Sequence, residues 1–272
     1  MNEKKSNTFA KKSFGQNFLT DQNYIDKIIS ALNPRKNETI IEIGAGRGAL
    51  TEKLLQSGAK VIAIELEREM VAVLKDKFGV LENFTLVEQD ALKVDFQELL
   101  NQIPNPKTKL VANLPYYIST AILQKLIEQR ACFSEMILMF QREVVQRITA
   151  QVGNKERGFL TVLVEAYLEA EKLFDVSPNA FRPAPKVWSA VVRLIPKAEN
   201  AFGVEKLFRA LISAGFAQKR KTILNNLKNA PPGLRDKIVD PEKCLEKAQI
   251  APNRRAETLS VEEWKQILSV LT

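Results

Sequence analysis

Residues 39–48 read TIIEIGAGRG, an apolar stretch that ends in three glycines at alternate positions. The β-branched residues predict a buried strand over Thr39–Ile43, and helical spacing follows over Ala49–Ser57. Glycine lets the chain turn sharply and approach a ligand, while the first turn of the helix offers unpaired N–H groups. This stretch therefore predicts one strand–turn–helix unit of an α/β sheet, with a ligand bound at the turn.

The same alternation of apolar and amphipathic stretches continues to Gln141 and indicates a doubly wound parallel sheet. We expect Gly58 and Gly79 at the ends of helices, and a rigid segment at Pro178–Pro185 that is not helical throughout. The further strands expected are Val61–Glu65, Phe84–Gln89, Lys109–Asn113, Met136–Phe140, Lys172–Val176 and Val187–Ile195, with another helix at Glu67–Phe78.

The pattern changes to helical periods after Pro196. We therefore expect two domains, with the sheet in residues 1–200 and a small all-helical domain in residues 201–272. The helical periods of the second domain are Val204–Ala217, Thr222–Asn229, Pro241–Ala248 and Val261–Leu271.

The amino-acid composition excludes several classes of active site. The chain has 272 residues, 45% of them hydrophobic, and no histidine, which excludes histidine triads and histidine acid–base catalysis. Its two cysteines, Cys132 and Cys244, are too far apart for a paired thiolate site, so we expect no metal. Without a long apolar stretch, we expect a soluble cytoplasmic protein and no membrane partner. The net charge of +8 fits either a polyanionic partner or a solvated lysine surface.

Two carboxylates follow predicted strands and extend the ligand site. Glu65 ends the second strand, where an acid binds ribose hydroxyls, and Asp90 follows the third, where it can accept a hydrogen bond from an adenine amine. With Gly44 and Gly46, these residues predict a nucleoside cofactor. Both S-adenosylmethionine and a nicotinamide dinucleotide fit, because the third glycine of a dinucleotide motif would fall at Ala49 and its permissive form also accepts alanine.

The fourth predicted strand ends in the sequence NLPY, residues 113–116. An exocyclic adenine amine is a weak nucleophile, because its lone pair is delocalised into the ring. The Asn113 side-chain oxygen and the Leu114 carbonyl can accept its hydrogen bonds and favour a pyramidal nitrogen, with Pro115 fixing the turn. Tyr116 offers a face on which a flipped base can stack. This chemistry needs no general base, which agrees with the lack of histidine.

Over nearly its whole length, the sequence resembles the ribosomal RNA adenine N6,N6-dimethyltransferases. The resemblance is carried by FGQNFL at residues 14–19, the glycine turn, NLPY and FRPAPKV at residues 181–187. Within that family, Ser189–Leu194 and Phe216–Thr222 resemble the branch that modifies the small ribosomal subunit. Two positions depart from many relatives, since Tyr117 stands in place of asparagine and Trp188 in place of aspartate.

The resemblance implies a target and a set of contacts. The target would be N6 of two adjacent adenosines in the 3′-terminal hairpin loop of 16S rRNA, dimethylated within an immature small subunit. Tyr116 and Phe181 would sandwich the adenine, and Asn113, Leu114 and Tyr116 would be the catalytic residues. The predicted S-adenosylmethionine contacts are Asn17, Leu19, Gly44, Gly46, Glu65, Asp90 and Asn113.

The basic run Lys219, Arg220 and Lys221 is a candidate phosphate contact in a helical RNA-recognition domain. Exposed cations of this kind can equally be solvated surface residues with no ligand.

We expect a monomer. Three alternatives stay open: a methyltransferase of the antibiotic-resistance branch that acts on large-subunit rRNA, a non-catalytic subunit-assembly factor, and a nicotinamide-dependent oxidoreductase. The last lacks a recognisable catalytic Tyr–Lys pair or histidine.

Overall fold

The computed structural model describes residues 17–101, 108–198 and 205–272. None of the helices in these ranges is long and apolar enough to cross a lipid bilayer. The strands are β1 (Phe18–Leu19), β2 (Thr39–Ile43), β3 (Lys60–Glu65), β4 (Phe84–Glu88), β5 (Thr108–Asn113), β6 (Glu135–Gln141), β7 (Leu168–Val176), β8 (Phe181–Arg182) and β9 (Ser189–Pro196). The α-helices are α1 (Gln22–Leu32), α2 (Ala49–Gln56), α3 (Arg68–Phe78), α4 (Phe96–Asn101), α5 (Ser119–Glu128), α6 (Arg142–Ile148), α7 (Phe159–Tyr167), α8 (Glu205–Gly215), α9 (Ile223–Lys228), α10 (Pro232–Arg235), α11 (Pro241–Lys247) and α12 (Val261–Leu271).

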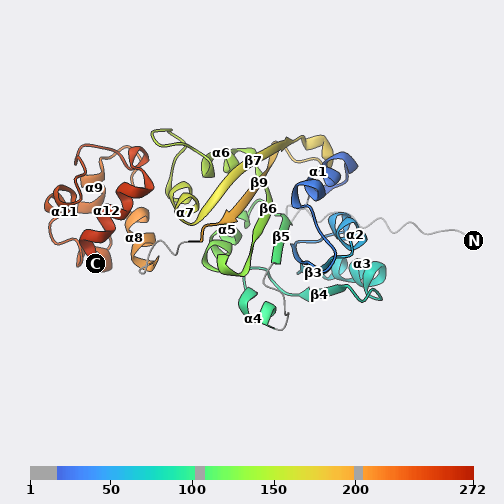
Figure 1. The fold of residues 1–272 in the computed structure, drawn as a ribbon. Coiled ribbons are helices and arrows are strands. Elements are labelled where there is room, and N and C mark those ends of the chain that lie inside the picture. The colour runs from blue at the N-terminus through green and yellow to red at the C-terminus, as the bar shows by residue number, and fades with distance from the viewer. Residues whose placement is uncertain (1–16, 102–107, 199–204) are drawn as a thin grey trace, which may run out of the picture. The chain divides into compact units, whose positions relative to one another are not determined.

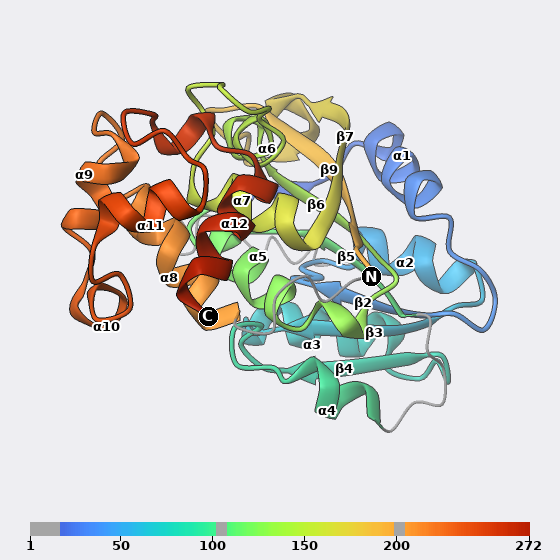
Figure 2. The same ribbon diagram turned by 60° about the vertical axis from the view of Figure 1, so that its left-hand side comes forward.

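Among the described residues, a central sheet of seven strands has the order β4-β3-β2-β5-β6-β9-β7. Figure 1 shows this sheet from β4 and β3 at one end to β9 and β7 at the other. Strand β1 pairs with β8 in a separate two-stranded sheet. Strands β2 to β6 of the central sheet pair in parallel, whereas β9 is antiparallel to β6. Helices α1, α2 and α3 lie together on one side of this sheet and α5 on the other (Figures 1 and 2). The expected doubly wound α/β fold is confirmed.

The strand order reverses at β2. From there the chain adds β3 and β4 on one side and then returns to add β5 and β6 on the other. Connections that leave in opposite directions open a crevice at the carboxyl ends of the two strands between them, here β2 and β5. The glycine turn and the NLPY segment follow these two strands, so the topology brings them to the same crevice.

The strands predicted from the sequence are all present, with small shifts at their ends. The largest difference is β7, which begins at Leu168 rather than at Lys172. It is the last strand in the sheet order, and its early residues include the exposed Glu169 and Glu171. Charged residues are usual on edge strands. Because the prediction relied on apolar stretches, it missed the charged first half of β7.

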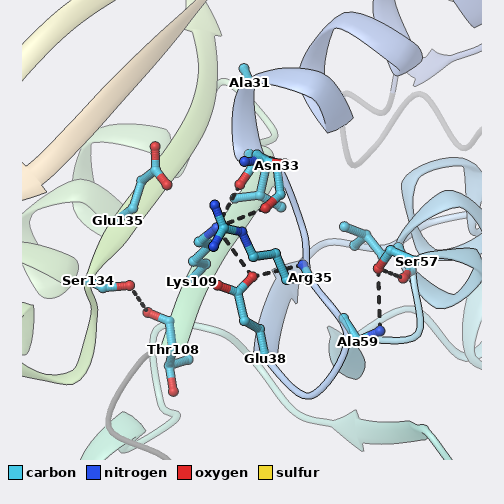
Figure 3. Close-up of polar contacts among 12 residues, drawn as sticks. Ala31, Asn33, Arg35, Glu38, Ser57, Ala59, Thr108, Lys109, Ser134 and Glu135 are labelled. Atoms are coloured by element: carbon cyan, nitrogen blue, oxygen red, sulfur yellow. Dashed lines mark hydrogen bonds and ion pairs between the residues drawn. The ribbon is translucent and has the colours of Figure 1, made fainter.

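Helix α1 is fixed to the amino edge of the sheet by two cations, of which Figure 3 shows Lys109 beside Asn33 and Glu38. The Lys109 Nζ of β5 donates to the main-chain oxygen of Asn33 at 3.0 Å and lies 3.2 Å from the Glu38 carboxylate. Arg193 of β9 donates to the main-chain oxygen of Ala31 at 3.0 Å. Carbonyl groups at a helix end attract cations, so these bonds stabilise the helix and hold the β1 segment that precedes it.

The described residues form two compact units, one within residues 1–145 and 171–196 and one within residues 146–170 and 197–272. This division differs from the expected 1–200 and 201–272, because residues 146–170 belong to the second unit. Helix α7 explains the difference, since it is buried on nearly all sides. Its Tyr167 ring meets Phe208 of α8 edge-on at 6.2 Å, and the Tyr167 carbonyl accepts a bond from the Lys197 N–H. Residues 205–272 are helical and contain no strand, as expected.

One tight contact inside the second unit can be tested. Gly215, at the end of α8, is packed under the fully buried indole of Trp264, and an added Cβ would overlap that ring and lie 3.2 Å from Ile223. We expect Gly215→Ala to lower the free energy of unfolding by about 1–3 kcal/mol through overpacking. Denaturant unfolding followed by circular dichroism measures this loss.

The matched control is Gly233→Ala in α10, where nothing lies within 4 Å of the added Cβ. This variant should be as stable as the parent protein or slightly more stable, because alanine favours a helix. Similar losses in both variants would show that the Trp264 contact does not limit position 215.

Candidate active site

The glycine turn after β2 has the predicted sharp geometry. Gly44, Gly46 and Gly48 have φ values of 72°, 55° and 82°, a region that side chains disfavour. A Cβ on Gly46 would lie 3.3 Å from the Phe18 ring, and one on Gly48 would lie 2.5 Å from the Phe78 ring. The turn therefore requires glycine both for its backbone angles and for the close packing around it.

The Glu65 carboxylate holds this turn in place. It accepts hydrogen bonds from the main-chain N–H groups of Gly46 at 2.9 Å, Leu66 at 2.9 Å and Glu67 at 3.0 Å. The side chain is buried, with 8% of its surface exposed. Each carboxylate oxygen can accept more than one bond, so Glu65 can still meet a ligand hydroxyl while it joins the turns after β2 and β3.

A cavity of about 480 Å³, termed here the larger cavity, opens at the carboxyl ends of these strands. Gly44, Glu65 and Asp90 line it together, as the sequence predicted. Ile118 and Ile122 supply an apolar wall that the sequence argument did not anticipate, because α5 was not expected there. Two carboxylates beside an apolar wall suit a nucleoside, which combines ribose hydroxyls with a flat base.

A second cavity of about 80 Å³, termed the smaller cavity, shares Gly44, Glu65 and Pro115 with the larger one. It contains the predicted catalytic segment, and Asn113 directs its side-chain nitrogen toward the main-chain oxygen of Asn17 at 3.5 Å. This orientation leaves the Asn113 side-chain oxygen to accept a hydrogen bond. The other residues that line the smaller cavity are Phe18, Gly46, Leu114, Tyr116 and Phe181.

Tyr116 is fixed by a residue distant in sequence. Its hydroxyl lies 2.7 Å from the hydroxyl of Ser189, and its main-chain oxygen accepts a bond from the Ser119 hydroxyl at 3.0 Å. Burial raises the pKa of the Tyr116 phenol above its usual range, although the bond with Ser189 opposes that effect. A tyrosine phenol is already neutral near pH 7, and this shift keeps it so at higher pH, so Tyr116 presents an aromatic ring rather than a base.

The amino-terminal segment reaches the smaller cavity by strand pairing. In the two-stranded sheet, Phe18 pairs with Arg182 and Leu19 pairs with Phe181. Phe181 lines the smaller cavity together with the NLPY segment, but only 1% of its surface is exposed. The Leu19 side chain packs in the hydrophobic core and lines neither the larger nor the smaller cavity. The structure thus groups Asn17 with the smaller cavity, and it places Leu19 in a neighbouring pocket whose lining also includes Gly44, Gly46 and Asn113.

The remaining predicted positions are exposed. Lys219, Arg220 and Lys221 lie between α8 and α9 in the second unit, with their side chains in solvent. Tyr117 is 64% exposed and lines the larger cavity. Trp188 is 44% exposed and directly precedes Ser189.

Comparison with known proteins gives consistent results. A family model described as ribosomal RNA adenine dimethylase matches residues 7–268. The chain is 41% identical over 260 residues to "Ribosomal RNA small subunit methyltransferase A" of Hahella chejuensis, which covers 95% of this chain and 91% of that protein. It is 42% identical over 265 residues to the protein of that name from Streptococcus sanguinis, covering 96% and 91%.

Two solved structures are similar. A dimethyladenosine transferase from Plasmodium falciparum has a TM-score of 0.78 at 28% identity and covers 93% of this chain and 96% of that one. The 23S rRNA methyltransferase ErmE has a TM-score of 0.68 at 24% identity, covering 94% and 99%, and so shares the fold.

A buried acid beside the glycine turn gives a pH-dependent prediction. Burial raises the pKa of Glu42 to about 7, repulsion from Glu65 adds to the shift, and a 2.6 Å bond from the Thr51 hydroxyl opposes it. Between about pH 4.5 and 7, the folded chain keeps a proton that the unfolded chain has released, so stability falls as pH rises through this window.

Glu42→Gln should remove that loss, because the amide stays neutral and can still accept the Thr51 bond. We expect the slope of unfolding free energy against pH to become less negative by up to about 1.4 kcal/mol per pH unit within the window. Denaturant unfolding at several pH values measures the slope. Parallel curves for the variant and the parent protein would contradict the assignment.

Proposed function

Because this chain belongs to the ribosomal RNA adenine dimethylase family, we propose that it dimethylates N6 of two adjacent adenosines in the 3′-terminal hairpin loop of 16S rRNA. The observation that carries the proposal is the position of NLPY. This segment, with the Asn113 side-chain oxygen available as an acceptor, lines the smaller cavity directly beside a cavity suited to a nucleoside. The relatives named for the small-subunit RNA match nearly the whole chain.

The methyl donor is S-adenosylmethionine, and the larger cavity fits it. All three predicted contacts line this cavity, where Gly44 would let the backbone approach the ligand, Glu65 would bind ribose hydroxyls and Asp90 would accept a hydrogen bond from the adenine amine. Ile118 and Ile122 offer an apolar surface to the base. When bound, this cofactor supplies an electrophilic methyl group on a sulfonium. The boundary shared by the two cavities, at Gly44, Glu65 and Pro115, is where donor and target would meet.

The protein's own contribution is alignment and hydrogen bonding. Asn113 and the Leu114 carbonyl accept hydrogen bonds from the target amine, which favours the geometry in which its lone pair is available. The Tyr116 ring supports the flipped base, and Ser189 holds that ring through the 2.7 Å contact. Phe181 lines the same cavity, although stacking on both faces of the base would require more of its ring to be exposed than the 1% seen here.

The choice of subunit follows from sequence similarity. The relatives at 41% and 42% identity carry the small-subunit name, whereas the 23S enzyme at 24% identity shares only the fold. We further propose that the chain acts as a monomer in the cytoplasm, on 16S rRNA within an immature small subunit.

The helical unit, with exposed Lys219 to Lys221, would supply RNA contacts.

The first test is transfer of labelled methyl from S-adenosylmethionine to small subunits that lack these methyl groups, followed by nucleoside analysis. We expect dimethyladenosine in small-subunit RNA and none in large subunits assayed in parallel. Label in large-subunit RNA would instead favour the resistance branch. No label in either would favour a binding-only assembly factor, and a thermal shift with a nicotinamide dinucleotide would then revive the oxidoreductase.

In the same assay, Asn113→Ala should reduce transfer roughly 100-fold or more, because it removes an acceptor that acts on the developing charge at nitrogen. Asn101→Ala, the same change at an exposed residue of α4, is the matched control and should leave transfer unchanged. Unchanged transfer by both variants would reject the catalytic role of Asn113.

Phosphate binding by the basic run is tested by salt dependence. Replacing Lys219, Arg220 and Lys221 together by Gln should weaken binding to small subunits and reduce the slope of log affinity against log salt by roughly one for each phosphate that is no longer neutralised. The control replaces Lys228, Lys243 and Lys247, three exposed lysines of the same unit, by Gln. The same slope change in both variants would show an effect of net charge alone, and cofactor affinity should change in neither.

A further inference from the structure

Trp188 is a large apolar side chain left in solvent. Its surface is 44% exposed and that of the preceding Val187 is 42% exposed, whereas Trp264, the other tryptophan in the chain, is fully buried. Hydration of so much apolar surface is unfavourable, and exposed aromatic groups of this kind often mark a place where a partner binds. The assigned chemistry does not use Trp188.

Its position ties Trp188 to the smaller cavity. The next residue, Ser189, is fully buried, and its hydroxyl lies 2.7 Å from that of Tyr116. Consecutive Cα atoms are about 3.8 Å apart. The backbone of Trp188 therefore lies next to the residue that holds the Tyr116 ring, and Tyr116 lines the smaller cavity, whereas Ser189 and Trp188 themselves do not.

Arg142 fixes the indole and adds charge. Its guanidinium carbon lies 5.7 Å from the centre of the Trp188 ring, and its main-chain N–H donates to the Trp188 carbonyl at 2.9 Å. Within the described parts of the chain, no carboxylate pairs with this guanidinium. Arginine prefers planar partners such as aromatic rings and phosphates, so the pair combines a stacking face with an available cation.

The surroundings favour an RNA over a protein as the occupant. Arg182 and Lys186, on the same segment, are exposed, and the whole chain carries a net charge of +8. A stable protein interface needs about 800 Å² from each partner, far more than two partly exposed apolar side chains provide. A single nucleobase needs only one aromatic face, and its phosphate is attracted to the neighbouring cations.

We propose that Trp188 and Arg142 form a second base-stacking subsite, which holds a nucleotide that flanks the target adenosine while the adenosine itself lies against Tyr116. This inference rests on the proposed function, because an RNA substrate with its target base against Tyr116 is what brings a flanking base near Trp188. Stacking on a neighbour stabilises the RNA in the conformation with its target base turned out. The subsite therefore contributes to substrate binding and not to the chemical step.

Fluorescence reports on the subsite directly. The probe is a short unmethylated RNA hairpin with two adjacent adenosines in its loop, titrated into the full-length protein. Because Trp264 is buried, quenching should come from Trp188, and Trp188→Phe should abolish it whereas Trp264→Phe should retain it. Absence of quenching in the parent protein, or quenching that persists in Trp188→Phe, would overturn the subsite.

Kinetics with unmethylated small subunits separates binding from chemistry. We expect Trp188→Ala to raise KM roughly ten-fold, the effect of removing the stacking face for one base, with little change in kcat or cofactor affinity. Trp188→Phe should stay close to the parent protein, since it keeps an aromatic face. Val80→Ala, at a residue that is 90% exposed outside both cavities, is the control for loss of an exposed apolar side chain.

The two proposals fail in different ways. No transfer by the parent protein would refute the proposed function, while the hairpin titration would still decide whether Trp188 stacks on RNA. Normal transfer by the parent protein with an unchanged KM in Trp188→Ala would refute the subsite alone. A lower kcat with unchanged KM would also refute it, because that result would place Trp188 in the chemical step.

Discussion

The backbone pairing of β2 with strands on both of its sides sets where the site can form. Ile43, the last residue of β2, pairs with Ile64 of β3 and with Ala112 of β5. Gly44 follows Ile43, Glu65 follows Ile64 and Asn113 follows Ala112. The glycine turn, the carboxylate and the amide therefore lie side by side at one edge of the sheet. The Gly44 N–H confirms this alignment by donating to the Ile64 carbonyl at 2.8 Å. A slip of one strand by a residue would separate these groups and turn their side chains to the opposite face.

The smaller cavity is completed by two segments outside the central sheet, β1 and the proline segment that contains β8. The pairing of β1 with β8 brings Asn17 and Phe181 to the same small cavity, and the cations at the end of α1 hold that segment against the sheet. The cavity is thus closed by chain segments more than 150 residues apart in sequence, as the bond between Thr20 and Ala180 shows with a separation of 160. Ordering these segments costs conformational entropy, which buried groups such as Phe181 offset.

The electrostatics of the site suit chemistry without a general base. Burial raises the pKa of the Tyr116 phenol further above neutral pH, and Glu42, in the strand that leads to the glycine turn, has its pKa raised to about 7. The carboxylate at the shared boundary is Glu65, which already accepts bonds from three N–H groups of the backbone. What remains for a substrate amine is a set of hydrogen-bond acceptors and an aromatic face, which act by position.

The sequence by itself determined the sheet, the glycine turn and the grouping of Gly44, Glu65, Asp90 and Asn113, because parallel strands place their carboxyl ends at one edge whatever the loops do. Asp90 needed only to follow the third strand, and NLPY only to follow the fourth. Tertiary structure decided the contacts that join distant segments: the Ser189 hydroxyl on Tyr116, across 73 residues, and the burial of Leu19 in the core. It also joined residues 146–170 to the C-terminal helices, since an α7 that is apolar on nearly all sides must be covered by whatever packs nearby. Local sequence patterns determine turns and strand ends. Contacts between segments far apart in the sequence depend instead on how whole elements pack together, which a short stretch of sequence does not indicate.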